Sequence, residues 1–209
     1  MNYNSRLIVL ECLLKVNKSG GYSNIVLDNQ LKKYDIANGF GVRVSLFVSG
    51  CPHHCKNCFN EVAWDYKYGK PFTAETIDEI VESLDKSYIK GLSLLGGEPM
   101  DPKNQEGLLP LLRAVKNALP DKDIWCYTGY LFDKEILDIM EPKYEFTKEI
   151  LSYIDVLVDG RFVESMADKG LVFRGSRNQR VIDVKKSLEL KKVVEIPVGD
   201  KEFKKVGQL

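Results

Sequence analysis

The sequence predicts an α/β fold built on a parallel β-sheet, preceded by a helical extension. Runs rich in β-branched and aromatic residues, typical of strands, alternate with segments whose apolar residues recur at helical spacing. The chain has 209 residues, of which 44% are apolar, so it is long enough for a buried core. Alternation of this kind is typical of βαβ units, in which a helix connects two parallel strands.

The first residues predict the extension, which we place at residues 1–32, before a main domain at residues 33–209. Leu7, Leu10 and Leu14 recur at helical spacing within residues 5–16, and Ser5 is a suitable cap for that helix. A second short helix is expected over residues 25–31. Residues 34–41 contain turn formers, and the sequence does not indicate what the extension does.

The first half of the main domain predicts two strands and two helices. Residues 42–48 form a β-branched and aromatic run, and residues 91–95 form a short apolar run that ends in glycine. A helix is expected from about residue 73 to residue 85, where the apolar residues make one face. A second helix is expected at about 105–119, for the same reason.

The second half continues the alternation. Residues 124–128 and 154–158 predict strands, and helices are expected around 133–140 and 146–152. Two more strand-like runs follow, at 181–184 and 193–198.

A distinctive stretch follows each of the four main strands: Cys51–Cys58, Gly96–Pro99, Thr128–Tyr130 and Asp159–Gly160. Because functional groups gather at the carboxyl ends of parallel strands, we expect these four stretches to meet on one rim.

Composition excludes several classes of protein. Thirty basic residues balance thirty acidic ones, so no net field attracts nucleic acid or an anionic membrane, and we expect neither as a partner. No apolar run approaches the roughly 18–20 residues that span a bilayer. The chain has only five cysteines, and three of them are clustered, which is not a secreted disulfide framework. We therefore expect a cytoplasmic protein.

The clustered cysteines, Cys51, Cys55 and Cys58, have the spacing C-x-x-x-C-x-x-C and predict a metal centre. Structural zinc needs four nitrogen or sulfur ligands and commonly uses separate cysteine pairs, whereas this chain has no second pair. His53 and His54 are possible fourth ligands, but the short interval leaves them little room. An iron–sulfur cluster held by three cysteines keeps one iron open, where a substrate with an amine and a carboxylate can chelate.

The cysteine spacing, together with Gly96-Gly97-Glu98-Pro99 after the next strand, resembles the radical S-adenosylmethionine enzymes. That resemblance implies a full or partial (βα) barrel. Longer stretches resemble one family within this group, the activating proteins of anaerobic ribonucleoside-triphosphate reductase. These stretches lie within about residues 33–198 and include 35–39, 42–51, 155–162 and 173–180.

The resemblance implies an enzyme with two cofactors. Cys51, Cys55 and Cys58 would hold a 4Fe-4S cluster, whose open iron would bind the methionine end of S-adenosylmethionine. An electron from a flavodoxin-like donor would cleave that cofactor, and the 5′-deoxyadenosyl radical would take a hydrogen atom from a glycine of the reductase large subunit. No catalytic side chain beyond the cluster ligands is implied.

The resemblance also places residues around S-adenosylmethionine. Asn57, Cys58 and Phe59 would lie against its adenine, while Gly96, Gly97 and Glu98 would surround its amino group. Glycines allow close approach of the backbone there. Asn57 stands where this family tends to have glycine, but asparagine tolerates a left-handed backbone.

Other readings remain open. A pyruvate formate-lyase activator or a deazaguanine synthase would share the cysteine loop, and a non-catalytic zinc-binding module is the alternative outside enzymes. We expect His53 and His54 to be exposed loop residues, with an electrostatic or proton-handling role as the alternative. We expect Cys126 to be a buried apolar filler. Tyr130 either lines the site or packs. The remaining candidates are Asp159, for cofactor or partner contact, and a basic patch of Arg174, Arg177 and Arg180, either solvated or docking the reductase.

Overall fold

The computed structural model describes residues 31–199. The helices expected at residues 5–16 and from Ile25 onward, as well as Cys12, lie outside the described residues. Of the expected extension only Leu31 and Lys32 are described, and they begin strand β1 (Leu31–Asp35). Within residues 31–199, no helix is long and apolar enough to cross a lipid bilayer.

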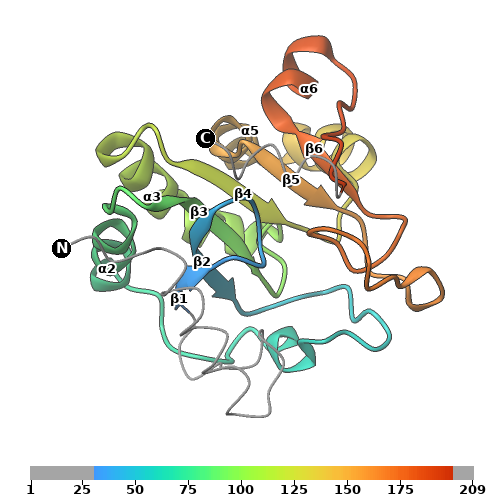
Figure 1. Cartoon of the computed structure of the whole chain (residues 1–209), viewed down its shortest axis with the longest axis horizontal. Helices are drawn as coiled ribbons and strands as arrows, with labels where there is room; N and C mark the ends of the chain where they lie inside the picture. Colours follow the sequence, from blue (N-terminus) through green and yellow to red (C-terminus); the bar gives the residue numbers. More distant parts are fainter. Residues whose placement is uncertain (1–30, 200–209) are drawn as a thin grey trace.

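Six strands form one sheet whose spatial order follows the chain (Figure 1). Strands β2 (Val42–Val48), β3 (Ile89–Gly96), β4 (Asp123–Tyr127) and β5 (Val156–Asp159) are parallel to one another. The edge strands β1 and β6 (Arg180–Asp183) are antiparallel to their neighbours. The carboxyl ends of the four central strands therefore lie at the same edge of the sheet.

Five α-helices occur among the described residues: α2 (Ala74–Leu84), α3 (Pro102–Ala118), α4 (Glu141–Lys143), α5 (Glu145–Tyr153) and α6 (Val184–Leu190). A π-helix, η2 (Phe132–Met140), leads into α4, and two 3-10 turns lie in loops, η1 (Glu61–Trp64) and η3 (Glu164–Met166). Helices α2, α3 and α5 lie in the connections between successive parallel strands, as βαβ units require.

One face of the sheet packs against these helices and forms the main core. Alternate strand residues such as Leu92, Ile124 and Leu157 are fully buried there, beside Leu112 of α3 and Ile150 of α5. The intervening residues point to the opposite face, because successive side chains of a strand alternate. These helices therefore do not cover the opposite face of the sheet.

The opposite face carries a smaller aromatic cluster in which Trp125 packs edge-on against Phe40 and Phe173. Beneath Trp125 lies the guanidinium of Arg43, 5.4 Å from the ring centroid and fully buried. Arg43 donates to Ser93 Oγ (2.7 Å) and to the Leu92 carbonyl (2.8 Å), so its buried charge is hydrogen-bonded. The aromatic cluster and Arg43 together cover part of the opposite face of the sheet, near the middle of the strands.

The structure confirms the four expected central strands, the strand at 181–184 within about a residue, and the helices at 73–85 and 105–119. Helix α3 begins earlier than expected, at Pro102, because the Asp101 carboxylate accepts a hydrogen bond from Lys103 N and caps the helix. The segment expected as α-helix at 133–140 is a π-helix, in which Ile136 N donates to the Leu131 carbonyl.

At the edges of the sheet the structure differs in three places from what the sequence led us to expect. Residues 36–41 are bends, as their turn formers indicate, but Tyr34 and Asp35 end strand β1, which was not expected and whose lysines suit an exposed edge. Helix α6 was not expected, since seven residues are too few to show a helical period; the Asp183 carboxylate caps it by accepting from Lys186 N. Residues 193–198 form only a single bridge, at Glu195 to Ile182, rather than a strand.

Candidate functional site

The cysteine loop leaves the carboxyl end of β2 through Ser49 and Gly50. Gly50 has φ +88°, and a side chain there would collide with the ring of Tyr66, so only glycine fits. Gly50 N donates to the Ala63 carbonyl (2.8 Å) and Cys51 N to the Trp64 carbonyl (3.3 Å). The start of the loop is therefore fixed to η1.

The far end of the loop turns sharply around Asn57. Cys58 N donates to the Cys55 carbonyl (3.1 Å), and Asn57 has φ +57°, the left-handed conformation that asparagine tolerates. The Asn57 side chain also donates to the Glu164 carboxylate of η3, which in turn pairs with Lys56. The conformation expected of Asn57 is thus confirmed, and its amide is used to hold the loop.

One cavity of about 460 Å³ collects the eight residues to which the resemblance gives a role with the cluster or S-adenosylmethionine. It is lined by Cys51, Cys55, Cys58, Asn57, Phe59, Gly96, Gly97 and Glu98. Thr128, Gly129 and Gly160 line it as well, so all four stretches that follow the central strands meet there. Its size lies within the usual range for small-molecule sites.

Gly96, the last residue of β3, and Gly97, which follows it, are required first for packing against the cysteine loop. Gly96 has φ +106°, and a Cβ on Gly97 would lie 2.5 Å from the Gly50 carbonyl oxygen. Gly97 N donates to the Val48 carbonyl (2.7 Å), and Glu98 N donates to that of Gly50 (2.8 Å). The turn after β3 therefore lies directly against the backbone that carries the first cysteine.

The three thiols share one partly buried environment. The pKa of Cys51 is raised to about 11, chiefly by burial and also by the neighbouring Glu98 carboxylate and the other two thiols, against one backbone hydrogen bond that lowers it. Burial also raises the pKa of Cys55. Without a metal, the thiols of Cys51 and Cys55 therefore keep their protons at neutral pH, and a bound metal has to displace those protons.

The donor set fits an iron–sulfur cluster, because three soft sulfur ligands line the same cavity. In such a cluster each thiolate binds a different iron, so the three sulfurs need not converge on one point. Among residues 31–199, no three His, Cys, Asp or Glu side chains surround a site for a single metal ion.

A buried hydrogen-bond network ties the loop to the strand ends. The Glu98 carboxylate is almost fully buried and accepts from Met100 N (2.8 Å), Gly129 N (2.7 Å) and His53 Nε2 (2.7 Å). Arg161 Nε donates to His53 Nδ1 (3.0 Å). Because arginine can only donate, Nδ1 is the acceptor, and the ring proton lies on Nε2, facing Glu98.

The expectation that His53 is an exposed loop residue was therefore wrong: its side chain is 5% exposed. Residues after β4 and β5 cover it, since Tyr130 packs edge-on against its ring at 4.4 Å and Gly129 lies against the ring where no side chain would fit. His54 is exposed as expected, and its ring stacks on Trp64 at 4.6 Å.

The other candidates separate into structural and cavity residues. Cys126 is a buried core residue, as expected. Tyr130 packs and is not part of the cavity lining. The Asp159 carboxylate accepts from Phe132 N (2.8 Å) and from Arg180, so it holds the ends of β5 and β6 together.

The expected basic patch does not form as a unit. Arg180 is paired with Asp159 and Asp133, and Arg177 is paired with Asp168. Arg174 instead lines the cavity, where its Nε is buried without a hydrogen-bond partner, as is the hydroxyl of Tyr127 on the same lining. Buried polar atoms of native proteins nearly always have partners, so these two atoms indicate that the cavity takes a polar ligand.

Comparisons with known proteins agree with the chemistry of the donor set. A family model described as a 4Fe-4S single cluster domain matches residues 37–182, which include the loop cysteines and the turn after β3. The anaerobic ribonucleoside-triphosphate reductase-activating protein of Vibrio cholerae is 46% identical over 153 residues, covering 72% of this chain and 94% of the relative.

Relatives of the same name come from other bacteria. The protein of Pasteurella multocida is 44% identical over 147 residues, 69% of this chain and 89% of the relative. The protein of Escherichia coli K12 is 41% identical over 155 residues, 73% of this chain and 96% of the relative.

Proposed function

Because this chain belongs to the family of anaerobic ribonucleoside-triphosphate reductase-activating proteins, we propose that it generates a glycyl radical on such a reductase. When bound, a 4Fe-4S cluster supplies the electron that cleaves S-adenosylmethionine to methionine and a 5′-deoxyadenosyl radical, which takes a hydrogen atom from the reductase glycine. The protein is then a radical-generating oxidoreductase, and a flavodoxin-like protein is the source of the electron.

Different residues of the cavity are proposed to hold the cluster and S-adenosylmethionine. Cys51, Cys55 and Cys58 are the proposed cluster ligands, and three ligands leave one iron open for substrate. The backbone from Asn57 to Phe59 is proposed to lie against the adenine. The turn from Gly96 to Glu98 surrounds the amino end of the methionine part.

Arg174 is a cavity residue that sequence reasoning assigned only to a surface patch. We propose that its unpartnered Nε donates to the carboxylate of the methionine part, since a guanidinium binds carboxylates well. Its sequence context offered no sign of this, because its place in the cavity depends on how the chain after Gly160 folds back over the sheet.

The observation that carries the proposal is the single cavity that joins the cysteine loop to the turn after β3. The order of the strands from β2 to β5, with the connecting helices on one face, supports a partial (βα) barrel of radical S-adenosylmethionine type. We assign this barrel to the main domain expected at residues 33–209, together with Leu31 and Lys32 of the expected extension, because these two residues pair with β2.

The test is anaerobic reconstitution followed by reaction with the reductase. We expect about four irons with sulfide per chain, reductive release of methionine and 5′-deoxyadenosine, and a glycyl radical signal on the reductase. With α-deuterated glycine in the reductase, deuterium should appear in 5′-deoxyadenosine. Cofactor cleavage without any glycyl radical would refute the activase assignment and favour another short radical enzyme. One zinc per chain with no absorbance near 400 nm would refute the cluster.

A further inference from the structure

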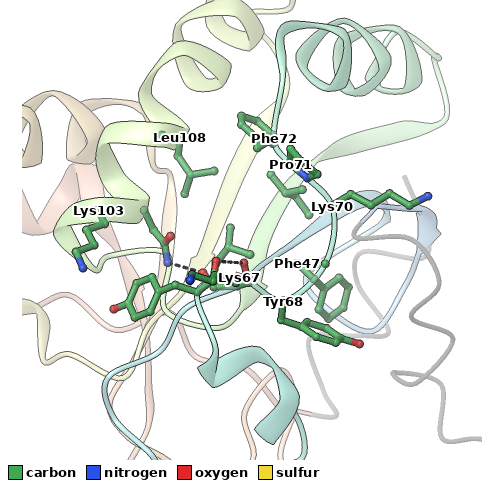
Figure 2. Close-up of a pocket in the computed structure, with 15 residues that line it drawn as sticks. Phe47, Lys67, Tyr68, Lys70, Pro71, Phe72, Lys103 and Leu108 are labelled. Carbon is green, nitrogen blue, oxygen red and sulfur yellow. Dashed lines mark hydrogen bonds between the residues drawn. The ribbon is translucent and has the colours of Figure 1, made fainter.

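A second cavity, of about 330 Å³, lies beside the same cysteine loop (Figure 2). It is formed by the end of β2, the loop that leads into α2, and the first turns of α3. It shares no lining residue with the cavity described above. The second cavity borders Leu46 and Leu108 of the helix-covered core, whereas the first borders Tyr127 and Val158 of the opposite face. The two cavities therefore lie on different faces of the sheet beside the strand end that carries the cysteine loop.

The lining of the second cavity is basic, and we call it the lysine groove after Lys67, Lys70 and Lys103. None of the described residues that line it is Asp or Glu. Within residues 31–199, Lys67 and Lys103 form no ion pair with a carboxylate. In the view of Figure 2, Lys103 and Lys70 lie on opposite sides of the groove with Lys67 between them.

The groove also exposes aromatic surface. Tyr66 is 41% exposed and Tyr68 is 39% exposed, although both are large rings. Exposed lysines spread along an open groove, rather than converging on one point, suit a broad anionic surface better than one small anion. Lysines at a rim combined with aromatic rings fit an acidic protein partner, whose approach the positive charge would steer.

The groove is closely connected to the first cysteine. The ring of Tyr66 lies against the backbone of Gly50, the residue before Cys51, with no space for a side chain between them. Asn104 Nδ2 donates to the carbonyls of Ser49 (3.0 Å) and Gly50 (3.2 Å). A partner seated in the groove would therefore be separated from Cys51 by little more than one residue of rigidly held backbone.

We propose that the lysine groove is the docking surface for the acidic flavoprotein that delivers the electron. The donor then approaches the cysteine loop from one side, while substrate and reductase use the cavity on the other. In the transfer, an anionic flavin hydroquinone gives up one electron and becomes the neutral semiquinone, so no proton passes between the proteins. This inference rests on the proposed function and adds to it the place where the partner binds.

The test compares two charge reversals in the reconstituted full-length protein. One variant carries K67E with K103E in the groove. The matched control carries K148E with K192E, two exposed lysines on α5 and after α6 that lie outside the groove. The probe is a reduced acidic flavodoxin. We would measure its affinity and the salt dependence of binding, and the rate at which it reduces the iron–sulfur centre, with dithionite as a chemical reductant for comparison.

The groove variant should bind flavodoxin at least about tenfold more weakly at low salt, with a shallower salt dependence, and its reduction by flavodoxin should slow by a similar factor. Reduction by dithionite and cofactor cleavage with dithionite should match the unaltered protein, and the control should match it in every measurement. Equal flavodoxin binding in the groove variant and the control would overturn the proposal.

Two further outcomes are also decisive. If the groove variant loses dithionite reduction as well, K67Q with K103Q replaces it, because that variant removes the positive charges without adding negative ones. Unchanged flavodoxin binding in K67Q with K103Q refutes the proposal. If ATP or pyrophosphate binds the groove tightly while flavodoxin binding is unaffected by the lysines, the groove is a small-anion site and the proposal is wrong. Failure of cofactor cleavage in the unaltered protein with dithionite would instead refute the proposed function.

Discussion

Replacement of His53 by alanine tests whether the buried network around Glu98 holds the cysteine loop. The change removes the Nε2 donor from a carboxylate that is almost fully buried and leaves it with two backbone donors. Loss of one hydrogen bond to such a group costs about 2 kcal/mol. The cavity left by the ring beside Tyr130 adds about 1 kcal/mol, so we expect the free energy of unfolding to fall by about 3 kcal/mol.

The assay is urea and thermal unfolding of the metal-free protein, in which a loss of this size lowers the midpoint by about 6–12 °C. His53→Gln retains an amide donor near Nε2 and should recover about half of the loss. Arg161→Ala is the matched control on the solvent side, because the Arg161 side chain is 50% exposed, and it should cost less than about 1 kcal/mol. A His53→Ala protein within about 0.5 kcal/mol of the unaltered one would refute the reasoning.

The other predictions concern the metal centre and the cofactor. Cys55→Ala should lose the iron–sulfur absorbance and all cleavage of S-adenosylmethionine. Cys126→Ala should keep both, because Cys126 lies in the core on the other face of the sheet. Equal loss in the two variants would mean that the ligand set is wrong. Iron uptake by the metal-free protein should be faster at pH 9 than at pH 7. The pKa of Cys51 is raised to about 11, so its thiol is protonated at neutral pH and the metal must compete with that proton. Stopped-flow absorbance measures the rate of uptake, and a rate that does not change with pH would contradict the assignment of Cys51 as a ligand. By the same shift the metal-free protein should lose stability as pH rises from about 9 to 11, since only the unfolded chain releases the proton in that window. Arg174→Ala should weaken S-adenosylmethionine binding about tenfold, because the contact with the carboxylate is lost. Arg177→Ala should leave the binding unchanged, since the Arg177 guanidinium pairs with a surface carboxylate. Calorimetry with the reconstituted protein measures both affinities.

Local pattern was sufficient for the central part of the fold. The four parallel strands and the helices between them follow from runs of residues whose period is visible within one segment. The same is true of the cysteine spacing and of the glycines after β3, because both lie on single short stretches. The rule that strand ends share one edge then placed these stretches together, as the cavity confirms.

Weak or short patterns were the ones misread. Strand β1 contains two lysines and an aspartate, and it pairs because β2 offers it a free edge. Helix α6 has seven residues, and the π-helix differs from an α-helix only in its hydrogen bonds, so neither leaves a clear period in the sequence.

The sequence by itself determined the metal ligands proposed here and the strand ends that surround them, since these depend on spacing along one segment. Only the tertiary structure decided the roles of His53, Arg161 and Arg174. His53 bonds to Glu98 across 45 residues and to Arg161 across 108 residues. Contacts of that separation depend on how the whole sheet and its loops pack, and no local period encodes them.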